Sequence, residues 1–520
     1  MRHLNLKARH LMMVLAAMSM MTFNSCKNEE PEPTPTPEEA GTEAVLKFFK
    51  EVNAVPRPSM HEDKMRDYLK SFAAARNLRC VEDNGNIIIY KDATSGMAGA
   101  PMVCLQTHMD MVCAAAEGYE IDFETQGIEQ EVEGNLIHSK GYKTSLGADD
   151  GIGVANVLAV LDSKTISHGP LECLFTWNEE QGMDGAKALS EGLLKSKYLF
   201  NIDWEQEGEI CVGTAGGEQV EITLNATAET IPTDYAALQI AIRGLTGGHS
   251  GVNITTGSGN AIKLMGDFLK THPAKIASIN GGTFPNSIAE FCTCVVAVPA
   301  ADKENYKQAL TAYQANMMQK FAKTDPGMSI TISEVSLPSQ CLSTAHSTLV
   351  ANGLADAPQG VTEWSTTVSG MFEASNNVGV IALTDGQLKV NYYARGFHDE
   401  KIAQLVTAID EAWLIGSSEA NSRHFGGFSP WSPSPMSSLL QFAQDTYRAR
   451  FQKPIMLQIV GGGLELSEFS VKYPDMQFLS FGPTIHDPHT PNETVEISSI
   501  EPCWQFLVGL LKNIENVNNK

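Results

Sequence analysis

Short apolar runs that stop at an acidic residue or a histidine recur in the first half of the chain. Such runs occupy 102–107, 171–176 and 198–202, and they stop at His108, at the Glu179–Glu180 pair and at Asp203. Continuous apolar runs are typical of strands covered on both faces of a sheet. Ligands of open α/β sheets gather at the carboxyl ends of such strands, which is where these polar side chains fall.

Two adjacent acids, Asp149 and Asp150, form a fourth candidate site between glycines. The apolar residues that follow recur at helical spacing: Val154, Val157, Leu158 and Leu161. Both acids therefore lie at the start of a predicted helix, where the helix dipole favours anions. Capping of that helix would explain one acid but not two.

The hydrophobic pattern changes near residue 218, where shorter runs alternate between apolar and polar residues. Alternation is typical of antiparallel strands with one exposed face. We predict an α/β fold, in which a mixed, mostly parallel sheet covered by helices forms a catalytic domain from residues 43–217 and 419–520. Residues 218–418 are predicted to form an inserted α+β lid domain, which also serves for dimerisation.

Composition narrows the range of partners. The 520 residues are 43% apolar and 19% charged, as in an ordinary globular protein, and the formal net charge is -24. Nucleic acids and anionic lipid surfaces bind clustered lysine and arginine, so this charge argues against both. A small, soluble substrate is expected instead.

The first 42 residues have a different character. A basic leader precedes the apolar stretch Leu11–Met21, which is too short to span a bilayer, and Ser25-Cys26 resembles the lipobox of bacterial lipoproteins. Residues 27–42 are rich in proline and glutamate and favour an extended linker. The pattern predicts a signal peptide over 1–26, lipidation of Cys26, and a bacterial envelope location in which this lipid anchor is the only membrane contact.

Five residues form a mixed imidazole and carboxylate set: His108, Asp149, Glu180, Asp203 and His489. This set suits zinc, cobalt or manganese, whereas calcium sites use oxygen ligands alone. Two metals held by five protein ligands must share one of them. Asp110 follows His108 by two residues, and a carboxylate that accepts from the second ring nitrogen would fix the tautomer that binds metal.

Seven motifs occur in a fixed order: HMDMVC at 108–113, LGADDGIG at 146–153, NEEQGMDGA at 178–186, NIDWEQEGEICVGTAGG at 201–217, GGHSG at 247–251, GGTFPNSI at 281–288 and SFGPTIHDPHTPNE at 480–493. From about residue 43 to its end, the chain resembles the co-catalytic zinc metallopeptidases that include aminoacylase and carboxypeptidase G. Within that family it is most similar to the aminoacyl-histidine dipeptidase branch.

The resemblance implies a role for each member of the set. It implies that His108 and Asp203 bind one metal, that Glu180 and His489 bind the other, and that the Asp149 carboxylate bridges them. It also implies that the peptide bond from Asp149 to Asp150 is cis. Two divalent metals, zinc in the first place, are the implied cofactors. Glu179 is then the general base and Asp110 orients His108.

The resemblance also implies contacts with the substrate. His249 of the inserted domain would help to bind the oxyanion, and Asn286, Arg395 and Glu465 would contact the substrate. For Arg395 the alternative is an ordinary surface charge. In dimeric members of the family this histidine reaches across from the partner subunit, so a homodimer is a further hypothesis.

Some positions depart from the pattern of the branch. Asn253 and Thr255 replace an acidic residue and a histidine, and Gly461 replaces the histidine of His-Ala-Gly-Leu-Glu. We therefore expect a dipeptidase that cleaves Xaa-His or a broader range of short peptides. The alternatives are an amidohydrolase that removes acyl groups from amino acids and a catalytically silent peptide-binding lipoprotein. Retention of Glu179 beside all five ligands favours hydrolysis.

Overall fold

The computed structural model describes residues 37–366, 370–415, 419–434 and 437–518. One large element of the fold is a mixed eight-stranded sheet. Its strands, in spatial order, are β1 (Arg79–Asp83), β2 (Asn86–Lys91), β6 (Leu171–Thr176), β3 (Val103–His108), β7 (Tyr198–Asn201), β21 (Gln477–Ser480), β8 (Glu209–Thr214) and β20 (Met456–Val460). The central strands β6, β3, β7 and β21 run parallel, so their carboxyl ends meet at one edge of the sheet.

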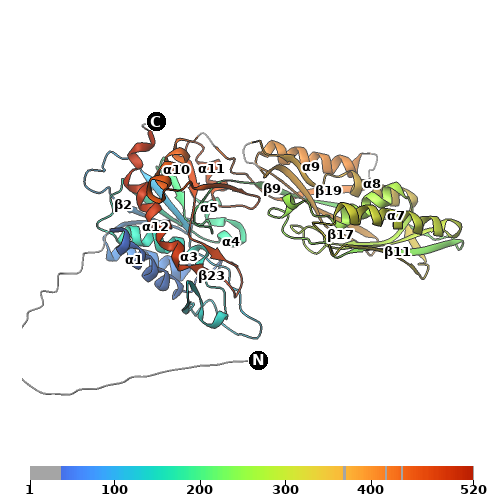
Figure 1. The fold of residues 1–520 in the computed structure, drawn as a ribbon, viewed down its shortest axis with the longest axis horizontal. Coiled ribbons are helices and arrows are strands. Elements are labelled where there is room, and N and C mark those ends of the chain that lie inside the picture. Colours follow the sequence, from blue (N-terminus) through green and yellow to red (C-terminus); the bar gives the residue numbers. More distant parts are fainter. Residues whose placement is uncertain (1–36, 367–369, 416–418, 435–436, 519–520) are drawn as a thin grey trace, which may run out of the picture. The chain divides into compact units, whose positions relative to one another are not determined.

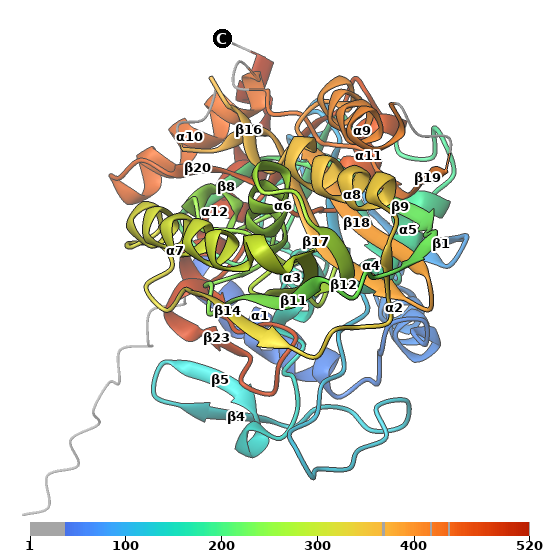
Figure 2. The same cartoon turned by 90° about the vertical axis from the view of Figure 1, so that its right-hand side faces the viewer.

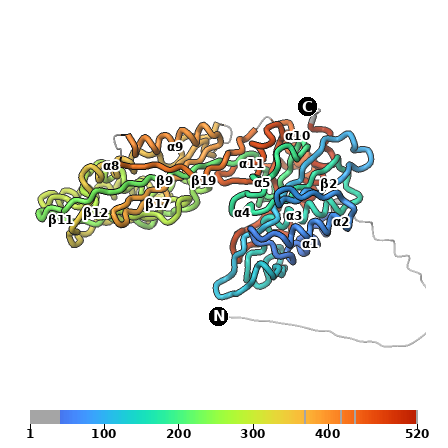
Figure 3. Tube along the Cα trace, turned by 180° about the vertical axis from the view of Figure 1, so that it is seen from behind, coloured from blue at the N-terminus to red at the C-terminus, as the bar shows by residue number. Residues whose placement is uncertain are grey.

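Helices cover both faces of this sheet (Figure 1). One face packs against α1 (Pro37–Asn53), α2 (Asp63–Ala75), α3 (Ala148–Asp162), α10 (Ser438–Phe451) and α12 (Ile497–Lys512). The other packs against the short helices α5 (Asp184–Ala188) and α11 (Leu466–Lys472). Along β3, Val103 and Leu105 join the first core and Cys104 joins the second, as expected for a strand without a solvent face. Figure 3 shows α1 and α3 side by side.

A second large sheet is antiparallel throughout. Its strands, in spatial order, are β14 (Ser329–Val335), β11 (Tyr235–Arg243), β13 (Cys292–Pro299), β12 (Lys275–Gly281), β17 (Phe372–Thr384), β18 (Gln387–Gly396), β9 (Gly216–Asn225) and β19 (Ala420–Phe428), with β16 (Gly360–Trp364) paired to β17. Helices α6 (Ala261–Thr271), α7 (Lys303–Lys320), α8 (Thr344–Asp356) and α9 (Asp399–Leu414) accompany it. Helices α6 and α8 lie side by side (Figure 2).

The second sheet contains the same topology twice. The elements β11, α6, β12, β13, α7 and β14 form one βαββαβ unit, and β9, α8, β17, β18, α9 and β19 form another. In both units the fourth strand lies beside the first, then the third and the second. The first unit is inserted into the second after β9, and the units meet where β12 pairs with β17.

Smaller elements complete the fold. A four-stranded sheet joins β22 (Ile485–His486), β23 (Thr494–Glu496), β5 (Leu136–Ser139) and β4 (Gln130–Glu133), and β10 (Ala228–Thr230) pairs with β15 (Gln340–Leu342). The short helix α4 spans Glu179–Gly182, and the 3₁₀ helices are η1 (Lys140–Tyr142), η2 (Ile254–Thr256), η3 (Ala300–Asp302) and η4 (Ile514–Asn518).

The predicted fold class, a mixed α/β sheet covered by helices with an additional α+β lid, is confirmed. Within the part of the chain that the structure describes, none of the helices has the length and apolar character required to span a bilayer. The predicted signal peptide (1–26) with its lipidation site Cys26, and the first ten residues of the predicted linker, lie outside the described residues.

Candidate metal centre

The carboxyl ends of β3, β6 and β7 carry most of the predicted metal ligands. His108 is the last residue of β3, and it is paired with Thr176, the last residue of β6. Glu179 and Glu180 begin α4, which starts three residues after the end of β6, and Asp203 follows β7 by two residues. Because the three strands are parallel neighbours, these side chains gather at one edge of the sheet.

All five predicted ligands meet there, and Asp149 lies between the two histidines. His108 Nε2 lies 2.9 Å from Asp149 Oδ1 and 3.5 Å from Asp203 Oδ1. His489 Nε2 lies 3.0 Å from Asp149 Oδ2 and 2.9 Å from Glu180 Oε2. Among the described residues, three groups of donor atoms here could hold a metal ion: two triads that share Asp149, namely His108 with Asp203 and Glu180 with His489, and a third group of His108, Glu179 and Glu180. The two triads that share Asp149 have the grouping that the resemblance implies. The Asp149–Asp150 peptide bond is cis.

The donor set fits two divalent metals. Zinc binds imidazole nitrogen and carboxylate oxygen at about 2.0–2.2 Å, which places neighbouring donors of a tetrahedral site roughly 3.4 Å apart. The four spacings given above are 2.9–3.5 Å, at about that value or somewhat below it. In addition, Glu180 Oε1 is buried and has no hydrogen-bond partner among the described residues, so an acceptor is left free at the site.

Asp110 is held where it can orient His108. Its Oδ1 lies 3.2 Å from His108 Nδ1 and accepts the Glu179 N–H at 3.1 Å, while its Oδ2 accepts the Ser59 hydroxyl at 2.8 Å. A His108 that donates from Nδ1 presents an unprotonated Nε2 to a metal. Glu179 is the first residue of α4. Burial raises the pKa of its carboxyl well above the ordinary value.

Two buried residues that were not predicted from the sequence fix the loops of the centre. Glu493, 2% exposed, accepts four successive backbone N–H groups, those of Leu146, Gly147, Ala148 and Asp149, at 2.6–3.2 Å. Arg57, 1% exposed, donates to Gly147 O at 2.5 Å and to Asp110 O at 2.6 Å. These contacts join the loop of the shared carboxylate to the loop that follows His108.

The second acid of the Asp149–Asp150 pair supports His108. Asp150 Oδ2 accepts the backbone N–H of His108 at 3.2 Å, and Oδ1 accepts the N–H of Gly153 at 3.1 Å. One acid of the pair is thus a candidate ligand, and the other connects the start of α3 to the end of β3.

His249, Asn286 and Arg395 form a separate group in the second sheet and its loops. Ser250 N–H donates to Asn286 O at 2.8 Å, and Gly251 N–H donates to His249 Nδ1 at 3.2 Å. Arg395 lies over the Tyr393 ring. Burial lowers the pKa of His249 below its ordinary value, and the nearby charge of Arg395 lowers it further. Arg395 is 4% exposed, so it is not an ordinary surface charge.

Glu465, the remaining predicted substrate contact, lies at the strand ends that carry the candidate metal ligands. It is fully buried, and its Oε2 accepts from Gln106 Nε2 and Thr176 Oγ1, both at 2.6 Å.

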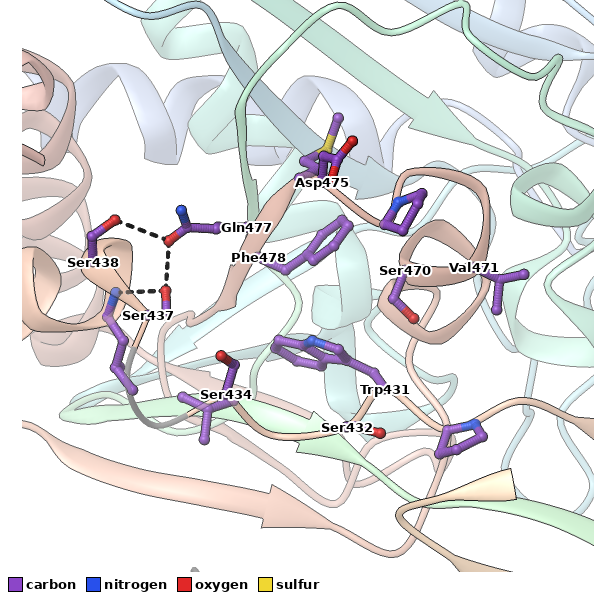
Figure 4. A pocket seen from close by; sticks show the side chains of 15 residues that line it. Trp431, Ser432, Ser434, Ser437, Ser438, Ser470, Val471, Asp475, Gln477 and Phe478 are labelled. Atoms are coloured by element: carbon purple, nitrogen blue, oxygen red, sulfur yellow. Dashed lines mark hydrogen bonds between the residues drawn. The ribbon is translucent and has the colours of Figure 1, made fainter. Parts of the chain in front are cut away.

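A cavity of about 730 Å³ lies elsewhere, between the start of α10, the end of α11 and β21 (Figure 4). Trp431 and Phe478 line it, and Ser437 and Ser438 donate to Gln477 Oε1 at 2.7 and 3.3 Å. None of the predicted site residues lines this cavity. These two hydrogen bonds connect the start of α10 to β21.

Comparisons with known proteins identify the family. The model of peptidase family M20/M25/M40 matches residues 104–513, so the chain belongs to this family of peptidases. The cytosol non-specific dipeptidase of Escherichia coli K12 is 34% identical over 472 residues, which cover 90% of this chain and 96% of the relative. The predicted family is thereby confirmed.

Solved structures agree with this assignment. The crystal structure of aminoacylhistidine dipeptidase from Vibrio alginolyticus superimposes with a TM-score of 0.86 at 34% identity, covering 90% of this chain and 96% of that one. Aminopeptidase PepT from Bacillus cereus ATCC 10987 superimposes with a TM-score of 0.54 at 17% identity, covering 91% and 98%, and shares the fold.

The predicted location at the bacterial envelope is wrong. The Escherichia coli relative that this chain matches over almost the whole of its length is a cytosol enzyme by name. The prediction relied on a basic leader, one short apolar run, the lipobox-like Ser25-Cys26 and the linker that follows, all within the first 42 residues.

Removal of metal is expected to make stability fall with rising pH. Burial and the nearby Asp149 raise the pKa of Glu180 to about 7, and hydrogen bonds to Asp149 and Glu180 raise that of His489 to about 11. The metal-free folded chain therefore binds more protons than the unfolded chain, so its stability decreases between about pH 5 and pH 8. Bound metals would replace these protons. Melting temperatures of chelator-treated and metal-loaded protein at both pH values test this, and a metal-free melting temperature that increases with pH contradicts it.

Proposed function

We propose that this chain is a metal-dependent dipeptidase that cleaves short peptides, including Xaa-His dipeptides. The observation that carries the proposal is the pair of histidine and carboxylate triads sharing Asp149, with Glu179 beside them. The names of the two relatives that match over 96% of their length, a non-specific dipeptidase and an aminoacylhistidine dipeptidase, support the choice of substrate.

In this proposal, His108 and Asp203 would hold one metal, Glu180 and His489 would hold the other, and Asp149 would serve both. Zinc is the first candidate, and cobalt or manganese also suits these donors. When bound, the metals would supply a nucleophilic water at neutral pH and polarise the scissile carbonyl. Asp110 keeps His108 in the tautomer that binds metal, through the 3.2 Å contact with Nδ1.

Glu179 acts as the general base. It belongs to neither triad that shares Asp149, and it lies within reach of the same centre, since its donor atom groups with those of His108 and Glu180. It takes the proton of the attacking water as the new C–O bond forms. It then passes that proton to the nitrogen of the leaving residue as the peptide C–N bond breaks.

The group around Arg395 binds the substrate. Gly251 N–H donates to Nδ1 of His249, so a neutral His249 carries its proton on Nε2 and donates from there to the developing oxyanion. Arg395 Nε is buried and unpaired within the described part of the chain, and a planar guanidinium matches a carboxylate. Arg395 therefore binds the C-terminal carboxylate of the peptide, and Asn286 contacts its backbone.

A substrate screen tests the proposal. We expect hydrolysis of free dipeptides, Xaa-His among them, by protein loaded with zinc, cobalt or manganese, and little hydrolysis of N-acetylated amino acids. Faster release of acyl groups than of amino acids would favour the amidohydrolase. Binding of dipeptides without turnover at full metal occupancy would favour the peptide-binding protein.

Replacement of Arg395 by alanine is expected to raise KM for free dipeptides about 10- to 100-fold, because a hydrogen bond to a charged group contributes about 1.5–3 kcal/mol. A dipeptide with an amidated C-terminus lacks that charge and serves as the matched substrate. Its KM is expected to change little between the two proteins. An equal loss for both substrates would assign Arg395 another role.

Complementation tests whether His249 acts in its own chain. The second sheet of a single chain already contains two units of equal topology, which meet where β12 pairs with β17. We therefore expect the site of one chain to be complete. A mixture of Glu179→Ala and His249→Ala chains should then remain inactive. Recovered activity would support the homodimer hypothesis and place His249 in the partner's site.

A further inference from the structure

A layer of buried polar side chains lies directly beneath the candidate metal ligands. We call it the sub-ligand layer, and it consists of Thr176, Gln106, Asn201 and Ser480, one from each of β6, β3, β7 and β21. Each is fully buried. Gln106 precedes His108 by two residues, so both side chains point to the same face of β3.

Hydrogen bonds run through this layer from side to side. Asn201 Nδ2 donates to Gln106 Oε1 at 2.7 Å, and Ser480 Oγ donates to Asn201 Oδ1. At the other end, Gln106 Nε2 and Thr176 Oγ1 both donate to Glu465 Oε2 at 2.6 Å. Glu465 is therefore the acceptor on which the chain of hydrogen bonds ends.

Burial of such a group is costly unless it is hydrogen-bonded, and a fully apolar layer would pack without that cost. One oxygen of Glu465, Oε1, is buried and has no partner among the residues described here. Burial raises the pKa of Glu465 to about 8. Without a partner in the described part of the chain, Oε1 of Glu465 is thus a buried polar atom that costs stability, at the place where the ligands need fixed positions.

Glu465 also connects this layer to the substrate group. It directly precedes α11 and follows the segment Gly461–Leu464. Gly461 O accepts from Arg395 Nη1 at 2.7 Å, and a side chain at Gly461 would meet Gly251 O at 1.9 Å, so the two backbones are in close contact. Only three residues therefore separate Gly461, the partner of Arg395, from Glu465, which supports the strand ends.

We propose that Glu465 is a positioning residue rather than a substrate contact. It fixes the position of the sub-ligand layer, and with it the ends of β3, β6 and β7, relative to the segment that contacts Arg395 and Gly251. The expected effect of Glu465 on turnover rests on the proposed peptidase reaction. Its expected effect on metal affinity does not depend on the substrate.

Two substitutions at one position test this. In Glu465→Gln a single amide oxygen can accept both existing hydrogen bonds, so metal affinity and kcat are expected to stay within about threefold of the unchanged protein. Glu465→Leu removes both bonds and is expected to lower metal affinity about 10- to 100-fold, the usual cost of losing an outer-shell partner of a metal site, and to lower kcat more than it raises KM. Competition with a chelator measures the affinity.

Glu172 supplies the matched control. It is also buried on β6, near the opposite end of the strand, and it accepts from Ser196 Oγ at 2.6 Å and from the N–H groups of Lys195 and Ser196. Glu172→Leu is expected to lower the melting temperature without changing metal affinity. If Glu465→Leu does not fold, Thr176→Val removes one of the two bonds and should weaken metal binding in the same direction.

Two results would overturn the proposal. A Glu465→Gln protein as impaired as Glu465→Leu would mean that the carboxyl group itself acts on substrate or proton. Glu465→Leu, or Thr176→Val in its place, with unchanged metal affinity and only a lower melting temperature, like Glu172→Leu, would mean a purely structural role. Failure of the proposed function is separate, because the unchanged protein would then bind metal and cleave no dipeptide.

Discussion

Glu179→Gln is expected to keep both metals and to lose turnover by roughly 10²- to 10⁴-fold, the usual contribution of a general base. Glutamine has nearly the same shape but accepts no proton at neutral pH. Both triads, which consist of His108, Asp203, Asp149, Glu180 and His489, remain complete without Glu179. Substrate affinity should therefore change much less than kcat.

The neighbouring residue is the control for this experiment. Glu180 Oε2 lies 2.9 Å from His489 Nε2, so Glu180→Gln should lose one metal per chain as well as activity. Metal content by mass spectrometry, measured together with kcat, separates the two carboxylates. A Glu179→Gln protein that loses metal, or that turns over normally with both metals bound, would rule out Glu179 as the base.

The sequence was sufficient to predict which candidate ligands gather at one edge of the sheet. His108, Asp203 and the Glu179–Glu180 pair each follow an apolar run, and parallel strands bring the ends of such runs together whatever the loops do. Asp149 and His489 do not follow from that rule alone. Their assignment depended on the order of the motifs, since a glycine-flanked acid also suits a helix cap.

The supports of the site could not be predicted in the same way. Arg57 and Glu493 bind backbone groups about 90 and 345 residues away in the chain, and a side chain that binds backbone leaves no pattern at its partner's position. Gln106 is a single polar residue within an apolar run, which predicts a strand but not a chain of hydrogen bonds across four strands.

The repeat in the second sheet was also missed, for a topological reason. One βαββαβ unit is inserted after the first strand of the other, so β9 and its neighbours β18 and β19 lie more than 160 residues apart in the chain. Alternating runs predicted antiparallel strands correctly, but alternation does not specify which strands pair.

Glu493→Gln is expected to cause the second large loss, of both metal affinity and stability. Each carboxylate oxygen of Glu493 accepts two backbone N–H groups, Oε2 those of Leu146 and Gly147 and Oε1 those of Ala148 and Asp149. An amide keeps one acceptor and turns its NH₂ group toward the other two donors. Two buried N–H groups then lack an acceptor, which costs about 1–3 kcal/mol for each.

The consequence reaches both metals, because the loop held by Glu493 carries the shared Asp149. We expect metal affinity to fall at least 10- to 100-fold, as for the loss of an outer-shell partner, with a clear drop in melting temperature. Glu496→Gln, three residues further on, changes a carboxylate that pairs with His486 at 2.8 Å and should leave metal binding intact. If Glu493→Gln binds two metals as tightly as the Glu496→Gln protein, the four hydrogen bonds do not position Asp149, and the placement of the shared ligand must depend on Arg57 and the start of α3 instead.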